Sequence, residues 1–296
     1  LTRSRDAKKK QKGSIIMKKK NWIIWAVVAV VIVVIGWFSF GHSSQTSNKT
    51  VTVGVVGQTS QDEAIWKEIA KVAKDKYGVT VKLKNFSDYN QPNKALQNGD
   101  VDLNAFQHQA FLDAWNKANK GTLVSIGKTF ITPIHLYSKK VTDVKDLPDG
   151  ATIAVPNDAS NESRALFLLK NAGLITLKTS AGSLATVKDI QDNPKNLKIK
   201  EVAAEQTART LDDVDAAVVN TNYAVAAKLP DSEIIYTEPV NKDSEQWINL
   251  IAAKKSDANK EAYKDVVKAY HTSQVKKVIQ KEYGNKEIPA WDLKLK

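Results

Sequence analysis

Residues 99–111 read GDVDLNAFQHQAF, and residues 212–224 read DDVDAAVVNTNYA. Each stretch contains Asp-Val-Asp, then a short apolar run, and then polar residues that include Asn or His. A short apolar run between turn-forming residues is typical of a buried strand. We therefore expect two buried strands, each of which ends in side chains that form hydrogen bonds.

The segments around these two strands predict two similar α/β units. In each unit a β-rich run is followed by an amphipathic helical pattern and then by a second β-rich run, which is typical of a parallel sheet. The β-rich runs are residues 51–57 and 78–86 in the first unit, and 151–155 and 197–202 in the second. We predict an α/β protein with two lobes built alike, although the similarity is too weak to be a sequence repeat.

The positive charge of the chain is concentrated at its N-terminus. The formal net charge is +12, and residues 1–20 hold nine Lys or Arg and one acidic residue. Residues 21–296 have 35 basic and 31 acidic residues, which leaves them only +4. A nucleic-acid groove needs basic residues gathered on a folded surface, so we expect no nucleic-acid partner.

An uncharged apolar run of 19 residues, Trp22–Phe40, follows the basic tail. A helix of this length spans about 30 Å of bilayer hydrocarbon, and the Lys and Arg before it orient the N-terminus toward the cytoplasm. The run is either a retained anchor or a signal peptide cut after Gly41, and its length favours retention. Translation starts at Leu1 or at Met17, which precedes three lysines. We therefore predict a cell-membrane protein whose binding part lies on the extracytoplasmic face.

The chain has no cysteine, which excludes disulfides and a thioether-linked lipid anchor. Attachment to the membrane must then rely on the apolar helix. The predicted organisation is a basic cytoplasmic tail (1–20), a transmembrane or signal-anchor helix (21–41), a linker (42–50), lobe 1 (51–133 and 241–296) and lobe 2 (134–240).

The polar residues that end the two strands predict a ligand site between the lobes. In open parallel sheets, ligands bind beyond the carboxyl ends of the strands. Phe106 and His108 of the first stretch would then face Asn220 and Asn222 of the second across a cleft. The alternative is that these residues only cap helices or bond to the backbone of loops.

Arg164 is a candidate for binding an anion. We expect it in the first turn of a helix capped by Ser160, where the helix dipole disfavours a cation. Free backbone N–H groups and a guanidinium together bind a carboxylate or a phosphate well. The alternative is a solvated arginine, or one paired with Glu162 or Asp158.

A second helix start is predicted by Ser60 and Glu63, which fit a capping box.

Catalysis has little support in the sequence. The histidines are His42, His108, His135 and His271, and their spacing does not match a zinc site. The chain has no G-x-S-x-G elbow, no phosphate-binding loop and no dinucleotide glycine motif. We expect a binding protein with no catalytic residue, metal or cofactor.

Residues 88–115, DYNQPNKALQNGDVDLNAFQHQAFLDAW, resemble the methionine-binding lipoproteins (the NlpA/MetQ-type family), which are substrate-binding components of ABC importers. The resemblance runs from about Val51 to Trp291. It includes ASNESRALFLL (159–169), VDAAVVNTNYA (214–224) and WINLIAAKK (247–255). It implies a type II-like periplasmic-binding-protein-like fold, in which two α/β lobes joined by crossing strands close on one L-methionine.

The resemblance also implies the ligand-binding residues, which are Tyr89, Phe106, His108, Asn161, Arg164, Asn220 and Asn249. The first three would line a thioether pocket, because sulfur packs well against aromatic edges. Arg164 would hold the α-carboxylate, with Asn161 nearby. Asn220 and Asn249 would bind the ammonium and carboxylate ends of the amino acid.

Two features depart from the family. The family usually carries a lipid-bearing cysteine after the signal peptide, and this chain has none, so the apolar helix is the predicted substitute. Phe111 stands where a tyrosine is commoner, and loss of that hydroxyl could alter the pocket. D-methionine, another apolar amino acid or a methionine-containing dipeptide therefore stay open as ligands.

The sequence thus predicts an extracytoplasmic protein that binds L-methionine and delivers it to an ABC permease and its ATPase. The N-terminal helix would hold it on the membrane. Two alternatives belong to other classes. One is an enzyme that reuses the fold, with His108 as general base, and the other is a membrane-anchored sensor or adhesion module.

Overall fold

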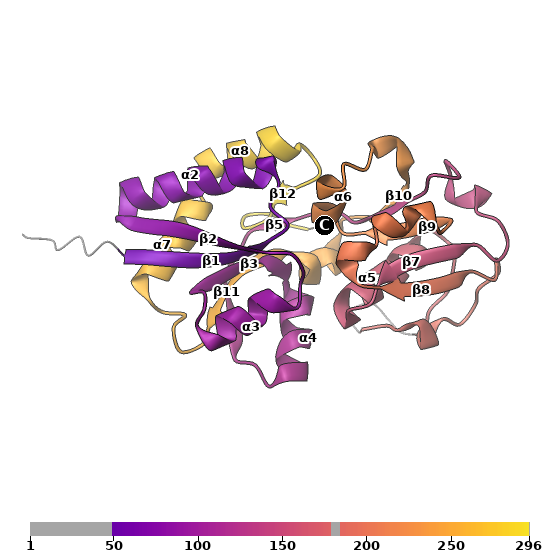
Figure 1. The fold of residues 1–296 in the computed structure, drawn as a ribbon, viewed down its shortest axis with the longest axis horizontal. Coiled ribbons are helices and arrows are strands. Elements are labelled where there is room, and N and C mark those ends of the chain that lie inside the picture. The colour runs from indigo at the N-terminus through magenta and orange to yellow at the C-terminus, as the bar shows by residue number, and fades with distance from the viewer. Residues whose placement is uncertain (1–48, 179–183, 296) are drawn as a thin grey trace, which may run out of the picture. The chain divides into compact units, whose positions relative to one another are not determined.

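Two five-stranded sheets organise the chain in the computed structural model, which describes residues 49–178 and 184–295. The first sheet has the order β2-β1-β3-β11-β4 and is made of β1 (Lys49–Val56), β2 (Val79–Phe86), β3 (Leu103–His108), β4 (Leu123–Lys128) and β11 (Asn249–Lys254). The second has the order β10-β6-β9-β7-β8 and is made of β6 (His135–Tyr137), β7 (Thr152–Pro156), β8 (Lys198–Val202), β9 (Ala216–Val219) and β10 (Ile234–Thr237). Figure 1 shows the first sheet on the left and the second on the right.

The two sheets share one arrangement of strand directions. In the first, β1 lies parallel between β2 and β3, and β11 lies antiparallel between β3 and β4. In the second, β7 lies parallel between β8 and β9, and β6 lies antiparallel between β9 and β10. The prediction of two α/β units built alike is confirmed.

The repeated Asp-Val-Asp has the same structural role in both sheets. The Asp102 carboxylate accepts a hydrogen bond from the Thr52 amide at 2.8 Å, and the Asp102 amide donates to the Thr52 carbonyl at 2.9 Å. Asp215 makes the same two bonds with Thr152, at 2.8 and 3.0 Å. Each aspartate therefore fixes the register between the first parallel strand of its sheet and the strand that carries the predicted site residues.

Helices cover both faces of the first sheet. Along β11, Ile251 and Ala253 point to one face, and Leu250 and Ala252 point to the other. The first face packs against α2 (Ser60–Tyr77), α7 (Glu261–Tyr270) and α8 (Ser273–Tyr283). The second packs against α3 (Gln91–Asn98) and α4 (Gln109–Asn119).

The second sheet packs against α5 (Ala159–Asn171), while α6 (Thr221–Ala226) follows its strand β9. Short 3-10 helices complete the connections, at η1 (Val144–Asp146), η2 (Val187–Asp189), η3 (Ala204–Gln206), η4 (Arg209–Asp212), η5 (Asp231–Glu233) and η6 (Lys242–Trp247).

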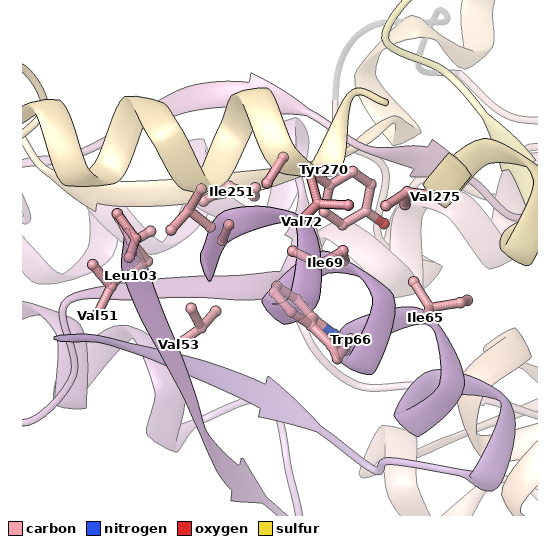
Figure 2. Close-up of a cluster of buried hydrophobic side chains, with 14 of the residues drawn as sticks. Val51, Val53, Ile65, Trp66, Ile69, Val72, Leu103, Ile251, Tyr270 and Val275 are labelled. Atoms are coloured by element: carbon pink, nitrogen blue, oxygen red, sulfur yellow. The ribbon is translucent and has the colours of Figure 1, made fainter. Parts of the chain in front are cut away.

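The core of the first lobe is built on the amphipathic face of α2. Figure 2 shows Trp66 and Ile69 of this helix next to Tyr270 of α7, and Ile65 on the side of Val275 of α8. Trp66 meets Tyr270 edge to face, with ring centroids 6.0 Å apart. This packing anchors the N-terminal end of α2 next to the predicted cleft.

Two helices begin earlier than the sequence predicted. The cap of α2 is Thr59, whose amide and hydroxyl both bond to Asp62 at 2.9 Å, so the capping box is Thr59–Asp62 and the prediction from Ser60 and Glu63 is wrong. The cap of α5 is Asp158, not Ser160. The Asp158 carboxylate accepts from the Asn161 amide and from the Ser160 hydroxyl, so Asp158 occupies the cap position and Ser160 is bonded to it. Arg164 is therefore the sixth residue of α5, in its second turn and two positions later than expected.

One short strand lies where the chain first passes between the sheets, and it pairs with a second short strand near the C-terminus. β5 (Phe130–Ile131) pairs antiparallel with β12 (Ile288–Pro289). The chain enters the second sheet after β5 and returns to the first sheet between β10 and β11. The boundaries predicted for the two lobes stay a prediction.

No helix in the described part of the chain has both the length and the apolar character needed to cross a bilayer. The predicted anchor, Trp22–Phe40, lies outside the described residues, as do the basic tail and most of the linker.

Candidate functional site

One cavity, of about 90 Å³, collects all seven predicted ligand-binding residues. Its walls come from the carboxyl ends of strands in both sheets, from the start of α5 and from the loop that precedes α3. The sequence-based expectation that the two polar strand ends meet across a cleft therefore agrees with the geometry. The role of each residue in ligand binding stays a prediction.

Three aromatic side chains form one wall of this cavity. Tyr89 lies in the loop between β2 and α3, Phe106 on β3 and Phe111 on α4. Their ring centroids are 5.8 Å (Tyr89–Phe106), 5.9 Å (Tyr89–Phe111) and 5.6 Å (Phe106–Phe111) apart. We call these three residues the aromatic wall. It offers ring faces and edges to an apolar or sulfur-containing group.

His108 connects the first lobe to the second through its ring. Its Nδ1 accepts a hydrogen bond from the Phe111 amide at 3.1 Å, so the proton of the neutral ring lies on Nε2. Nε2 then donates to Asn161 Oδ1 at 3.3 Å. Burial lowers the pKa of His108 to about 3, and the positive charge of Arg164 acts in the same direction. His108 is therefore a neutral donor near pH 7 and a poor general base, which argues against the enzyme alternative.

Asn161 and Asn220 leave one acceptor open at the cavity. Asn161 donates to both carboxylate oxygens of Asp158 at 3.0 Å, and its Oδ1 also accepts from Asn220 Nδ2 at 2.8 Å. Asn220 Oδ1 is buried and has no hydrogen-bond partner among the described residues. A buried acceptor without a partner is costly, so a ligand donor placed here would be stabilising.

Arg164 is almost completely buried, with 2% of its side chain exposed. Its Nε and Nη2 donate to the two carboxylate oxygens of Glu238 at 2.8 and 2.5 Å, and Nη2 also donates to the Thr132 carbonyl at 2.8 Å. The guanidinium carbon lies 5.2 Å from the Trp247 ring. Within the described residues, Nη1 has no hydrogen-bond partner, and Arg164 lines the cavity.

The partner of Arg164 differs from both sequence-based alternatives. It is neither solvated nor paired with Glu162 or Asp158, because Glu238 occupies two of its three nitrogens. Glu238 is 74 positions away and comes from the segment that returns to the first sheet, so no local pattern could reveal it. The guanidinium cannot offer its whole fork to a ligand carboxylate. Of the three guanidinium nitrogens, Nη1 remains for a ligand.

Asn249 and Asn222 complete the polar lining. Asn249 begins β11 opposite His108 in the strand register, which brings its side chain to the cavity. Asn222 also lines the cavity, and its Oδ1 accepts a hydrogen bond from the Tyr89 hydroxyl at 2.6 Å. Sequence reasoning placed both residues at the cleft and selected Asn220 as a ligand-binding residue. Both contribute, but only Asn220 has an unpaired oxygen.

The cavity extends toward two carboxyl groups in the first lobe. Asp62 accepts from the Tyr283 hydroxyl at 2.7 Å as well as from Thr59. Glu287, which is 4% exposed, also lines the cavity. Burial raises the pKa of Glu287 well above its usual value, and the negative charge of Asp62 adds to the effect. The sequence analysis missed both residues.

The described residues contain no group of three or more His, Cys, Asp or Glu side chains that could hold a metal ion. The polar groups of the cavity are instead suited to an organic zwitterion, since they combine guanidinium and amide donors with an unpaired amide acceptor.

A two-sheet α/β fold with a small cavity between its lobes defines a substrate-binding protein of the type that encloses a small molecule. The chain belongs to the NlpA lipoprotein family, whose model matches residues 51–291. The expected family resemblance is thereby confirmed.

Solved structures of named proteins agree with this assignment. The substrate-binding protein of a methionine transporter from Streptococcus pneumoniae is 47% identical, with a TM-score of 0.77, over 82% of this chain and 96% of that one. A nutrient-binding protein from Burkholderia cenocepacia, solved bound to methionine, is 47% identical, with a TM-score of 0.76, over 81% of this chain and 99% of that one. Among curated relatives, the D-methionine-binding lipoprotein MetQ of Escherichia coli O157:H7 is 41% identical over 271 residues, which cover 90% of this chain and 97% of the relative.

Proposed function

We propose that this protein is the substrate-binding component of an ABC importer and that it encloses one methionine between its lobes. The observation that carries the proposal is a cavity with an aromatic wall, an unpaired guanidinium nitrogen on Arg164 and an unpaired oxygen on Asn220. Its family includes a relative at 47% identity that was solved with methionine bound.

The cavity offers a separate partner for each group of the amino acid. Nη1 of Arg164 is the donor for the α-carboxylate, and a charge-assisted bond of this kind is among the stronger ones in proteins. Oδ1 of Asn220 is the acceptor for the ammonium, with Asn249 nearby. The aromatic wall and the edge of His108 receive the thioether.

The size of the cavity favours a free amino acid over a dipeptide. Its volume of about 90 Å³ holds about six to nine water-sized spheres. That is close to the number of non-hydrogen atoms in methionine. The name of the Escherichia coli relative specifies D-methionine, so both enantiomers are candidate ligands here.

Calorimetric titration of the purified protein with L-methionine, D-methionine and norleucine tests the ligand. Norleucine replaces the sulfur by a methylene, so weaker binding of norleucine would isolate the contribution of the thioether. Before titration, the protein is unfolded and refolded to release bound molecules, which are identified by mass spectrometry. If no methionine is released and neither enantiomer gives a binding heat, the proposal fails.

Arg164→Ala tests the assigned anion site. The change removes the only guanidinium that lines the described part of the cavity and leaves Glu238 as a buried charge without its partner. Loss of a charged hydrogen bond costs about 1.5 to 3 kcal/mol, so we expect methionine affinity to fall at least roughly 10- to 100-fold. Arg209→Ala, on η4 and away from the cavity, is the matched control. Near-native affinity of Arg164→Ala would reject the assignment.

Delivery to a permease and attachment through the N-terminal helix belong to the same proposal. The curated relatives are named lipoproteins, but this chain has no cysteine to carry a lipid, so we propose that Trp22–Phe40 holds it on the extracytoplasmic face. Resistance of the membrane-bound protein to carbonate extraction, together with its cleavage by protease added outside the cell, tests this topology. Recovery of the protein in the medium, cut near Gly41, would contradict retention.

A further inference from the structure

The side chain of Asn222, in the second lobe, contacts two residues of the first lobe. It lies on α6, and its Oδ1 accepts a hydrogen bond from the hydroxyl of Tyr89 at 2.6 Å. Its Nδ2 lies 3.5 Å from the position that a Cβ on Gly57 would occupy. Gly57 has a φ of +60°, so a side chain there would be strained as well as close to Asn222. Gly57 and Tyr89 thus form the surface of the first lobe that the Asn222 side chain contacts.

The hydrogen bond from Tyr89 to Asn222 involves a residue of the aromatic wall, because Tyr89 belongs to that wall. The ring of Tyr89 contacts Phe106 and Phe111 on its own lobe, and Tyr223 of the second lobe at a centroid distance of 5.0 Å. Burial raises the pKa of Tyr89 well above its usual value, so the hydroxyl stays protonated and remains a donor. Asn222 is its only hydrogen-bond partner among the described residues.

Other contacts between the lobes are weaker candidates for this role. The bond from His108 to Asn161 is longer, at 3.3 Å. The ion pair of Lys286 and Asp231 is exposed, and exposed pairs contribute little. The Tyr89–Asn222 bond is short and partly buried, so its loss leaves a partly buried hydroxyl without an acceptor.

We propose that Asn222 is a positioning residue that holds Tyr89 against the ligand and keeps the lobes closed, so that it sets the rate at which the ligand leaves. The identity of the ligand rests on the proposed function, but closure of the lobes does not. Because the bond can form only when the lobes are together, its loss accelerates ligand dissociation and leaves association nearly unchanged.

Stopped-flow dissociation of methionine, followed by tryptophan fluorescence, measures this effect in Asn222→Ala, Tyr89→Phe and the double variant. We expect Asn222→Ala to raise the dissociation rate roughly 2- to 13-fold, which corresponds to the net contribution of one hydrogen bond. The double variant should be no faster than Asn222→Ala, since the two residues share one bond. Asn171→Ala, on an exposed part of α5, is the control and should leave the rate unchanged.

A second measurement reports closure without reference to methionine. The absence of native cysteine allows spin labels at Lys67→Cys on α2 and Lys188→Cys on η2, both exposed positions. We expect Asn222→Ala to shift the distance distribution between the labels toward open lobes, and Asn171→Ala to leave it unchanged.

The outcomes separate the two proposals. If the wild type binds methionine and Asn222→Ala releases it within twofold of the wild-type rate, the inference about Asn222 is wrong and the proposed function stands. Additive effects of Asn222→Ala and Tyr89→Phe would also overturn it. If the wild type does not bind methionine, the proposed function fails, and an unchanged label distance in Asn222→Ala would overturn the inference separately.

Discussion

Replacing Glu238 by glutamine tests the most deeply buried ion pair of the described chain. Glutamine keeps the size of the side chain and one oxygen for Nε of Arg164, but it removes the negative charge and turns an NH₂ group toward Nη2. The exposed side-chain fractions are 2% for Arg164 and 7% for Glu238, so water cannot replace the lost carboxylate. The Ile134 amide, which donates to the same carboxylate at 3.2 Å, loses its acceptor as well.

The magnitude follows from this burial. Removing one partner of a buried pair leaves an uncompensated charge and costs about 3 to 5 kcal/mol. For a folded unit of roughly 250 residues, this corresponds to a drop in Tm of roughly 6 to 20 °C. Saturating methionine should restore part of the loss, because its carboxylate brings a negative charge to the freed guanidinium.

Thermal and urea unfolding of Glu238→Gln, with and without methionine, measure both effects. Glu245→Gln is the control: Glu245 pairs with Lys128 at the surface, with exposed fractions of 57% and 50%, and should cost no more than about 1 kcal/mol. A double variant, Arg164→Met with Glu238→Leu, should recover most of the stability while losing binding, since apolar pairs replace buried ion pairs well. If Glu238→Gln is no less stable than Glu245→Gln, the reasoning is refuted.

Two pH predictions have opposite signs. Because burial raises the folded-state pKa of Glu287 above its unfolded value, its stabilising contribution is complete below about pH 4.3 and is lost as pH rises, by up to about 1.4 kcal/mol per pH unit. Glu287→Gln should therefore be more stable than the wild type at pH 8. If the difference in stability between the two proteins is the same at pH 5 and at pH 8, the buried acid is contradicted. His108, with its pKa lowered to about 3, stabilises the fold above pH 6.5, and this contribution falls at lower pH by up to about 1.4 kcal/mol per unit. Urea midpoints of His108→Asn, which keeps a capping acceptor, should lose that dependence between pH 6.5 and 4, and an unchanged slope would refute a neutral histidine.

Much of the secondary structure could be predicted from the sequence. The apolar runs that end in polar residues are β3 and β9, and the helical patterns between β-rich runs are α2 and α5. These signals are local, because strand and helix periods are fixed by backbone geometry. The helix starts were less accurate, because several Ser, Thr and Asp residues compete within a few positions of each cap.

The site could be predicted only in part, because its contacts join distant segments. The strand ends identified His108 and Asn220, since their place in an open sheet is a property of topology. Glu238 and Glu287 have no local signature that distinguishes a buried carboxyl group from a surface one. Asn222 was ambiguous for a related reason: which of two neighbouring amides turns toward Tyr89 depends on the approach of the other lobe.

The position of β11 has a consequence for how the protein is made. All strands of the second sheet lie between residues 135 and 237, so a growing chain can complete that sheet without its C-terminal part. The first sheet cannot be completed this way, because β11 inserts between β3 and β4 only after the whole second sheet has been synthesised. The sheet that begins first is therefore the last to be completed, and until β11 is added, the edges of β3 and β4 that pair with it lack a partner strand.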